Sequence, residues 1–372
     1  MIYLDNAATT RPCPQAVEAM QKALTETWGN PSALHGLGLR AERVVKTARR
    51  QTAEALGCEP DRIFFTSGGT EGDNFALFAT AARLGKRGRH IITTAVEHHA
   101  VLNGARALEA RGFDVTYLEP EPDGTVSLDA LEAALREDTI LVSVMMVNNE
   151  TGAVNDVGAM AKLVHRKSDA LFHTDAVQGF LKVPFRASSL GADILTVSGH
   201  KIGGPKGVGA VYLAEGRHLP PFLYGGGQES GMRSGTENVP GVAGFGAACE
   251  VRSRDLRKRM SIMKALKERC LEGLAAIPEA EIIGGHQAPH VICLGVRGLR
   301  SQGLIGALEQ REIYVSAGSA CAKGHRSHVL EAMEVPGDLI DGAIRVSLGF
   351  ETTEEDIDGF LAGLREALVE LR

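Results

Sequence analysis

Between residues 63 and 213 the chain alternates short apolar runs with amphipathic runs, and this alternation constrains the fold more than any other feature. Seven apolar runs are typical of buried strands: Ile63–Thr66, Arg89–Thr94, Asp114–Leu118, Thr139–Val147, Leu171–Thr174, Ile194–Ser198 and Gly209–Leu213. Helical periodicity falls between several of them, over Asn74–Leu84, Ala100–Arg111, Leu128–Arg136 and Ala159–Arg166. The pattern predicts an α/β fold with a mostly parallel seven-stranded sheet covered by helices on both faces. Such sheets bind ligands at the carboxyl ends of their strands.

The flanking parts of the chain are more helical. Residues 1–14 have the pattern of an extended segment and turn, and two helices are expected before the first strand, over Gln15–Thr27 and Leu37–Leu56. Beyond about residue 240 we expect a long helical run over Pro240–Leu274, strands around His290–Val296, and helices over Ser301–Arg311 and Thr353–Leu371. We predict a large domain over residues 15–250 and a smaller one formed by residues 1–14 and 251–372.

Charge and cysteine usage exclude several classes of protein. A formal net charge of -6 over 372 residues, with both signs interspersed, gives no footprint for nucleic acid or an anionic membrane surface. Residues 1–6 lack the features of a secretory signal, and no apolar run is long enough to span a bilayer, so a cytoplasmic location is expected. The six cysteines are scattered without a Cys-x-x-Cys pair, so no disulfide framework and no metal site is expected. These features favour a small-molecule site.

A lysine among glycines follows the strand predicted at Ile194–Ser198. Lys201 stands in Ser198-Gly199-His200-Lys201-Ile202-Gly203-Gly204, where a sharp turn can bring its amine to the end of the sheet. A partly desolvated lysine can lose its proton and attack a carbonyl to form a Schiff base. Taken alone, the stretch is more typical of a surface loop.

Polar groups follow three other predicted strands. Gly69 and Thr70 lie where a strand runs into a helix, and the backbone N–H groups exposed there favour an anion. Asp175 ends another strand, where a carboxylate can pair with a protonated ring nitrogen, and Gln178 follows three residues later. His98 ends a third strand, where its imidazole can lie flat on an aromatic ring. Each feature alone also has a structural interpretation, such as a helix cap or a core histidine.

Together these groups indicate one cofactor. Pyridoxal 5′-phosphate needs an anion cradle, a flat partner for its ring, a carboxylate for its ring nitrogen and an amine for its aldehyde. Two features further along the chain add chemistry. Cys321 lies among small residues beside Lys323, His325 and Arg326, a polar setting that favours a thiolate. Arg345 interrupts an apolar strand pattern, where a guanidinium usually binds a carboxylate from the protein or from a substrate.

The ordered motifs resemble the cysteine desulfurases, which belong to the class V, aspartate-aminotransferase-like group of pyridoxal phosphate enzymes of fold type I. The similarity runs almost end to end, through the segments 3–10, 29–32, 66–71, 97–98, 147–152, 175–178, 198–201, 233–236, 318–321 and 345–349. The tail around Cys321 is similar to the branch that serves general and nitrogenase-type iron-sulfur assembly.

The resemblance implies a role for each site residue. The catalytic residues would be three: Lys201 as the Schiff-base lysine, which also moves protons, His98 as the ring-stacking acid-base partner, and Cys321 as the nucleophile that takes the substrate sulfur as a persulfide. Asp175 would pair with the pyridinium and Gln178 would contact the phenolic oxygen. The phosphate would be held by Gly69, Thr70, Ser198 and His200, together with Thr236 from the second subunit of a homodimer. Asn149 and Arg345 would hold the substrate carboxylate. The large domain is then the cofactor-binding domain, and the small one carries the cysteine loop.

The implied function is conversion of L-cysteine to L-alanine, with the sulfur passed to an acceptor or iron-sulfur scaffold protein for cluster or thio-cofactor assembly. The loop after Cys321 is about two residues shorter than in the housekeeping desulfurases and richer in charge. This departure leaves open how far Cys321 reaches toward a scaffold protein and which protein accepts the sulfur. Two alternatives remain at this point: a selenocysteine lyase or other pyridoxal phosphate lyase on the same scaffold, and a non-catalytic binding module. The set Lys201, Asp175 and Cys321 argues against the module.

Overall fold

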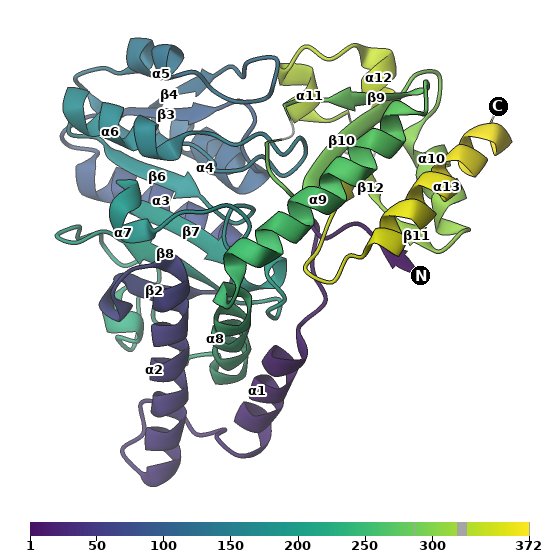
Figure 1. Cartoon of the computed structure of the whole chain (residues 1–372). Coiled ribbons are helices and arrows are strands. Elements are labelled where there is room, and N and C mark those ends of the chain that lie inside the picture. Colours follow the sequence, from purple (N-terminus) through teal and green to yellow (C-terminus); the bar gives the residue numbers. More distant parts are fainter. Residues whose placement is uncertain (286, 318–325, 372) are drawn as a thin grey trace.

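The computed structural model describes residues 1–285, 287–317 and 326–371. Its largest sheet has seven strands in the order β2-β8-β7-β6-β5-β3-β4 (Figure 1). These strands are β2 (Ile63–Thr66), β3 (His90–Thr94), β4 (Asp114–Leu118), β5 (Thr139–Ser143), β6 (Leu171–Asp175), β7 (Ile194–Ser198) and β8 (Gly209–Leu213). Only the pairs of β8 with β7 and β2 are antiparallel, so the predicted mostly parallel sheet is confirmed.

Helices cover both faces of this sheet because successive strand residues point to opposite sides. Ile91 and Leu141 belong to one apolar core, which includes residues of α3, whereas their neighbours Ile92 and Val142 belong to another, which includes residues of α6. The helices that follow the strands are α3 (Gly69–Leu84), α4 (His99–Glu109), α5 (Leu128–Ala134), α6 (Val157–Lys167) and α7 (Ala187–Leu190). Short connections of this kind place the strand ends together at one edge of the sheet.

Three helices project from the sheet as a separate bundle, at the bottom of Figure 1. They are α1 (Pro14–Thr25), α2 (Gly36–Leu56) and α8 (Val239–Ser253), and α8 packs against both of the others. The approach of α8 to α2 depends on Gly246, since a Cβ there would lie 2.6 Å from the Cα of Ala48.

A second, four-stranded antiparallel sheet forms from the C-terminal part of the chain, in the order β12-β13-β10-β9. Its strands are β9 (Ala280–Ile283), β10 (Val291–Val296), β12 (Ser316–Ala317) and β13 (Ile344–Ser347). The helices of this part are α9 (Leu256–Ala275), α10 (Ser301–Glu309), α11 (His328–Ala332), α12 (Gly337–Asp341) and α13 (Glu354–Glu370).

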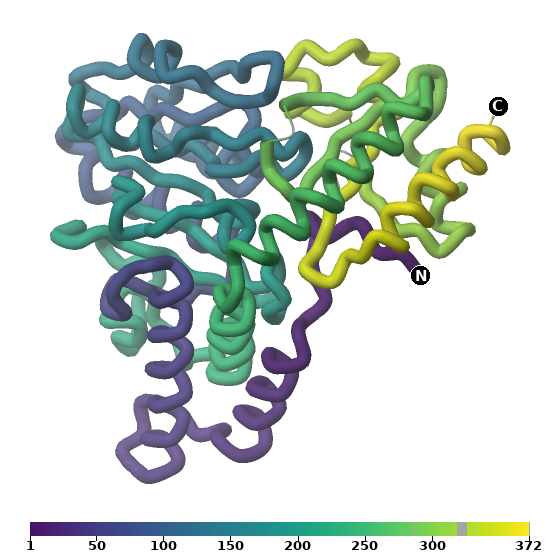
Figure 2. Tube along the Cα trace, in the orientation of Figure 1, coloured from purple at the N-terminus to yellow at the C-terminus, as the bar shows by residue number. Residues whose placement is uncertain are grey.

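The first residues of the chain join this C-terminal part. Strand β1 (Ile2–Tyr3) pairs in parallel with β11 (Ile313–Tyr314), and Leu4 lies in the same apolar core as residues of α9 and α13. The tube in Figure 2 shows the chain running from there past the large sheet to the projecting bundle. The N-terminal segment therefore crosses the region between the two sheets.

Three predicted boundaries were wrong. The helical run expected over Pro240–Leu274 is two helices, α8 and α9, because Asp255 adopts a left-handed conformation (φ 54°) between them. The strand expected to reach Val147 ends at Ser143, beyond which Val147 forms an isolated antiparallel bridge with Val154. Helix α3 begins at Gly69, earlier than expected, since glycines otherwise indicate a loop. No helix within the described residues is long and apolar enough to cross a membrane.

Candidate active site

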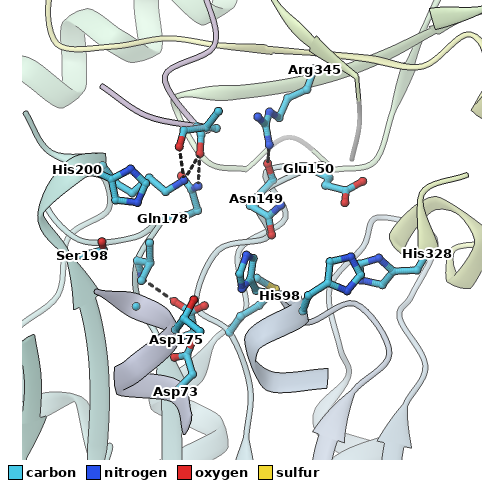
Figure 3. Close-up of a pocket in the computed structure, with 18 residues that line it drawn as sticks. Asp73, His98, Asn149, Glu150, Asp175, Gln178, Ser198, His200, His328 and Arg345 are labelled. Carbon is cyan, nitrogen blue, oxygen red and sulfur yellow. Dashed lines mark hydrogen bonds between the residues drawn. The ribbon is translucent and has the colours of Figure 1, made fainter. Parts of the chain in front are cut away.

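A cavity of about 310 Å³ opens where the segments that follow β5, β6 and β7 meet the small sheet (Figure 3). Ten of the twelve residues singled out from the sequence line it: Gly69, Thr70, His98, Asn149, Asp175, Gln178, Ser198, His200, Lys201 and Arg345. Thr236 is exposed and does not line the cavity of its own chain. Cys321 lies outside the described residues. The folded chain thus brings together residues from six separate stretches of sequence.

Lys201 reaches the cavity from a single 3-10 turn, Gly199–Lys201, directly after β7. Its Nζ donates hydrogen bonds to the carbonyl oxygens of Ala7, at 2.6 Å, and Ala8, at 2.8 Å. The turn continues through Gly203, whose φ of 82° favours glycine and whose Cβ would lie 2.9 Å from the guanidinium of Arg252. The amine is therefore aimed by the backbone on either side of it and by the N-terminal segment.

Asp175 ends β6 and is buried against the floor of the cavity. Its Oδ1 accepts from the backbone N–H of Val177 at 2.8 Å, and burial raises the pKa of this carboxyl to about 6, opposed by that N–H and by Lys201. A cation brought next to Asp175 would lower the pKa of this carboxyl again, against the effect of burial. The carboxylate is therefore arranged to receive a positive charge.

Two more buried carboxyl groups lie near Asp175, and the sequence interpretation missed both. Burial and the charges of Asp175 and Glu97 raise the pKa of Asp73 well above its usual range, and burial raises the pKa of Glu97 to about 8. His173 Nε2 lies 3.7 Å from Asp73 Oδ1, but burial lowers the pKa of that imidazole to about 3, so it brings no charge. Asp73 lies in the part of α3 that was expected to be a loop, and in the motif 97–98 only His98 was given a role, so neither acid was assigned one from the sequence.

The N-terminus of α3 forms one wall of the cavity. Gly68 has a φ of 151°, and no side chain caps the helix there, so its first-turn N–H groups face outward. Gly69 has no room for a side chain, because a Cβ would lie 2.9 Å from Val177. Ser198 and His200 lie beside this helix start in the cavity lining, and burial and Lys201 lower the pKa of His200 to about 3. A sixteen-residue helix with an open first turn suits a phosphate group.

His98 and His99 both line the cavity but have different surroundings. His98 precedes α4, and its Nδ1 accepts from the backbone N–H of Ala100 at 3.1 Å, so the neutral ring carries its proton on Nε2. Burial, Lys201 and His99 lower the pKa of His98 to about 4, which keeps the ring neutral. His99 instead packs against His328, with ring centroids 4.7 Å apart. The face of His98 is the better candidate for an aromatic ligand.

Arg345 enters the cavity from β13, with its side chain only 3% exposed. Its guanidinium donates to the carbonyl oxygen of Asn149 at 2.8 Å and to Asp5 Oδ1 at 2.9 Å, while Nε has no hydrogen-bond partner among the described residues. Nearby, Ser327 Oγ donates to Glu150, whose pKa burial raises to about 7. Glu150 and the N-terminal contacts of Asp5 were missed from the sequence, although Asp5 belongs to one of the motifs that carried the resemblance.

The site fits pyridoxal phosphate on several of its own features. The open helix start offers N–H groups to a phosphate. Burial raises the pKa of Asp175, so this carboxylate is suited to pair with a cationic ring nitrogen, and Lys201 points an amine into the same cavity. No group of three or more His, Cys, Asp or Glu side chains in the described ranges is placed to hold a metal ion.

Comparison with known families and curated proteins gives full-length matches. The model of the Aminotransferase class-V family matches residues 2–360. The cysteine desulfurase IscS of Methanosarcina thermophila is 40% identical over 376 residues, which cover 100% of this chain and 93% of that relative. A cysteine desulfurase of Trichormus azollae is 42% identical over 377 residues, covering 100% of this chain and 94% of the relative.

Solved structures give the same result. A NIFS-like protein superposes with a TM-score of 0.94 at 39% identity, and both chains are covered completely. The structure described as SspA in complex with cysteine has a TM-score of 0.84 at 32% identity, covering 95% of this chain and 100% of that one.

Proposed function

The chain belongs to the aminotransferase class-V family and is a pyridoxal phosphate-dependent cysteine desulfurase, and we propose how its residues divide the conversion of L-cysteine to L-alanine. The observation that carries this proposal is the cavity in which an amine, a buried carboxylate and an open helix start lie together, in a chain that matches cysteine desulfurases over its full length. The sulfur leaves as a persulfide on the enzyme.

Eight residues of this chain would hold the cofactor. Asp175 would pair with the ring nitrogen, since its raised pKa falls again when a cation approaches. His98 would lie on the ring face and Gln178 would donate to the phenolic oxygen. The phosphate would be bound by the first turn of α3 with side chains and backbone of Gly69, Thr70, Ser198 and His200. Lys201 would hold the cofactor covalently through Nζ, and when bound the cofactor supplies an electron sink for the carbon atoms of the substrate.

Two residues would hold the carboxylate of L-cysteine. Arg345 presents a buried guanidinium whose Nε is still without a partner among the described residues, and its contact with the carbonyl oxygen of Asn149 places both residues side by side. A planar guanidinium binds a carboxylate through N–H groups of fixed geometry, so Arg345 would offer this Nε to the substrate while Asp5 holds the side chain in place.

Lys201 and His98 would move the protons. Once its amine is released by the substrate, Lys201 can take a proton from the substrate Cα and return one to carbon. His98 keeps an N–H on Nε2 because its Nδ1 is engaged by Ala100, so this ring can donate a proton toward the substrate without first becoming cationic.

Cys321 would be the sulfur acceptor. Its thiolate attacks the sulfur of L-cysteine, an S–S bond forms and the C–S bond breaks, with the electron pair passing to the carbon side. Protonation of that carbon then gives L-alanine and leaves a persulfide on Cys321, so the substrate carbon is reduced while the two sulfur atoms are oxidised and no external oxidant is needed. A sulfur acceptor or iron-sulfur scaffold protein would receive the outer sulfur.

A homodimer completes the proposal. Thr236 is exposed, which suits a residue that reaches the phosphate of a second copy. Exposed apolar side chains gather on α1, on α2 and on the segment that joins them, a surface that a second copy would cover: Val17, Leu24, Trp28, Leu34 and Leu39. The separate apolar cores around the two sheets support a cofactor-binding domain over 15–250 and a small domain over 1–14 and 251–372. The five described cysteines are free thiols, in keeping with a reducing, cytoplasmic location.

The decisive experiment follows both products. Protein loaded with pyridoxal phosphate is incubated with L-cysteine, and alanine is measured together with a persulfide on the peptide that contains Cys321. Reduction with borohydride before digestion should place the cofactor mass on the peptide that contains Lys201. Alanine without a persulfide on Cys321, or the cofactor mass on another lysine, contradicts the assignment. Turnover of selenocysteine that survives Cys321→Ala, with negligible turnover of cysteine by the unmodified enzyme, would favour a selenocysteine lyase instead.

A further inference from the structure

Lys182 is a buried lysine that the proposed chemistry does not use. The residue is 1% exposed, and among the described residues the one hydrogen bond of its Nζ is to Gln178 Oε1, at 3.5 Å. Burial, with Lys201 and Arg345, lowers the pKa of this amine to about 7. Burying an amine that forms no ion pair costs stability, so a role for it should be sought in the residue that it contacts.

The backbone immediately before Lys182 is also strained. Leu181 is buried and has a φ of 58°, a left-handed conformation that a branched side chain disfavours. Strain of this kind persists when the surrounding packing fixes the conformation, and it clusters at functional sites. Here it coincides with the turn that directs Lys182 toward Gln178.

A second buried donor meets the same amide. His290 is completely buried, its Nε2 lies 3.4 Å from Gln178 Oε1, and its Nδ1 has no hydrogen-bond partner among the described residues. Burial and the nearby positive charges of Lys182 and Lys267 hold the pKa of His290 well below its usual range, so the ring is neutral. Because Oε1 can only accept, the single proton of this ring belongs on Nε2.

These contacts decide which way the Gln178 carboxamide faces. Its Nε2 donates to the carbonyl oxygen of Ala7 at 2.8 Å, one of the dashed bonds in Figure 3, while Oε1 faces the donors of Lys182 and His290. A flipped amide would set an N–H against the amine of Lys182 and an oxygen against the Ala7 carbonyl, so it is excluded. The second N–H on Nε2 then remains for the cavity that Gln178 lines.

We propose that Lys182 is a positioning residue for the bound cofactor: by donating to Gln178 Oε1 it fixes the carboxamide so that one N–H is held for the phenolic oxygen of pyridoxal phosphate. The inference rests on the proposed function, in which Gln178 contacts that oxygen. It goes beyond that function by assigning a task to a residue that touches neither cofactor nor substrate.

The test is a pH titration of the absorbance of the cofactor bound at Lys201. A donor on the phenolic oxygen competes with the proton of the bound chromophore for the same lone pairs, so losing the donor should raise the apparent pKa of the chromophore. We expect Lys182→Met, which keeps an unbranched side chain without a donor, to raise this pKa by about one unit, a tenfold change in the protonation constant. Lys162→Met, at an exposed position of α6, is the charge-matched control and should leave it unchanged.

A double-mutant cycle distinguishes action through Gln178 from a direct effect of the lysine charge. Gln178→Ala should raise the chromophore pKa by a similar amount, and adding Lys182→Met to it should change nothing further. An equal shift in both backgrounds overturns the proposal, and so does an unshifted Lys182→Met titration accompanied only by a change in thermal midpoint. If Lys182→Met does not fold, Lys182→Gln, whose shorter side chain withdraws the donor from Oε1, should give the same shift, and its absence is equally decisive. Failure of the unmodified protein to form a chromophore would instead refute the proposed function.

Discussion

Asp175→Asn is the substitution whose effect on cofactor binding can be worked out most fully from the structure. Asp175 is 6% exposed, one of its oxygens is held by the N–H of Val177, and the other is left to pair with the ring nitrogen of the cofactor. Losing a buried, charge-assisted hydrogen bond of this kind costs about 3 kcal/mol. Since 1.4 kcal/mol corresponds to a factor of ten, the cofactor should bind roughly 100-fold more weakly to the variant.

The ratio of the cofactor dissociation constants of the variant and the unmodified protein should also depend on pH, and this is the sharper part of the prediction. Burial raises the pKa of Asp175 to about 6, and only the ionised carboxylate attracts a cation. As the pH falls through 6 the unmodified protein therefore loses affinity, whereas the asparagine variant has no such group to protonate. At pH 5 only about one tenth of Asp175 is ionised, so the ratio of the two dissociation constants should shrink to about 10.

The assay uses pyridoxamine 5′-phosphate and protein from which the cofactor has been removed. This amine form cannot make the covalent link to Lys201, so calorimetric titration at pH 5, 6 and 7.5 reports the non-covalent contacts alone. Ionisation of the ligand itself cancels in the ratio of the two dissociation constants. Asp129→Asn, an exposed change in α5, controls for loss of a carboxylate. A ratio below about 3 at pH 7.5, or one that does not vary between pH 5 and 7.5, would refute the reasoning.

Three further substitutions test other parts of the site and its support. Burial raises the pKa of Glu97 to about 8 in the folded protein, so folding takes up a proton at this carboxyl and the free energy of unfolding falls by about 1.4 kcal/mol per pH unit between about pH 4.5 and 8. Glu97→Gln should therefore flatten the pH dependence of the free energy of unfolding measured with urea. An unchanged pH dependence would contradict the raised pKa. Asp5→Ala should leave Arg345 without its ion pair and raise the KM for cysteine several-fold more than it lowers kcat, because the guanidinium is no longer held in place; an effect on kcat alone would rule this out. Glu229→Gln removes the carboxylate that pairs with Arg49 at 2.6 Å, and it should lower the free energy of unfolding by about 2–4 kcal/mol. A decrease below about 0.5 kcal/mol, measured by urea denaturation, would argue against a structural role for this pair.

The central sheet and the residues at its strand ends could be predicted because one physical rule links them. Short apolar runs bounded by turn residues, such as Ile194–Ser198, are typical of strands buried on both faces, and parallel strands bring their carboxyl ends to one edge. Lys201 and Asp175, each directly after such a run, were therefore predictable as neighbours before any distance was known. The fold class and the family followed from the same pattern and from the motifs around it.

Other features depend on tertiary contacts that have no local signature. The carbonyl oxygens of Ala7 and Ala8 hold Lys201, yet a backbone oxygen looks the same in every residue. The break between α8 and α9 rests on the left-handed conformation of Asp255, which helical periodicity does not reveal. Lys182 resembles any other lysine in the sequence, and only its burial beside Gln178 gives it meaning.

The path of the N-terminal segment has a consequence for the order in which the protein is made. The contacts of this segment reach Glu312 and Tyr314 through β1, Arg345 through Asp5, and Ser347 through Asn6. The ribosome releases the first ten residues long before these partners exist, so the emerging chain cannot secure the segment that aims Lys201. The large sheet can fold during synthesis, but the lysine should acquire its final setting only after residues 312–347 have left the ribosome. Cofactor capture should accordingly follow synthesis of the second sheet.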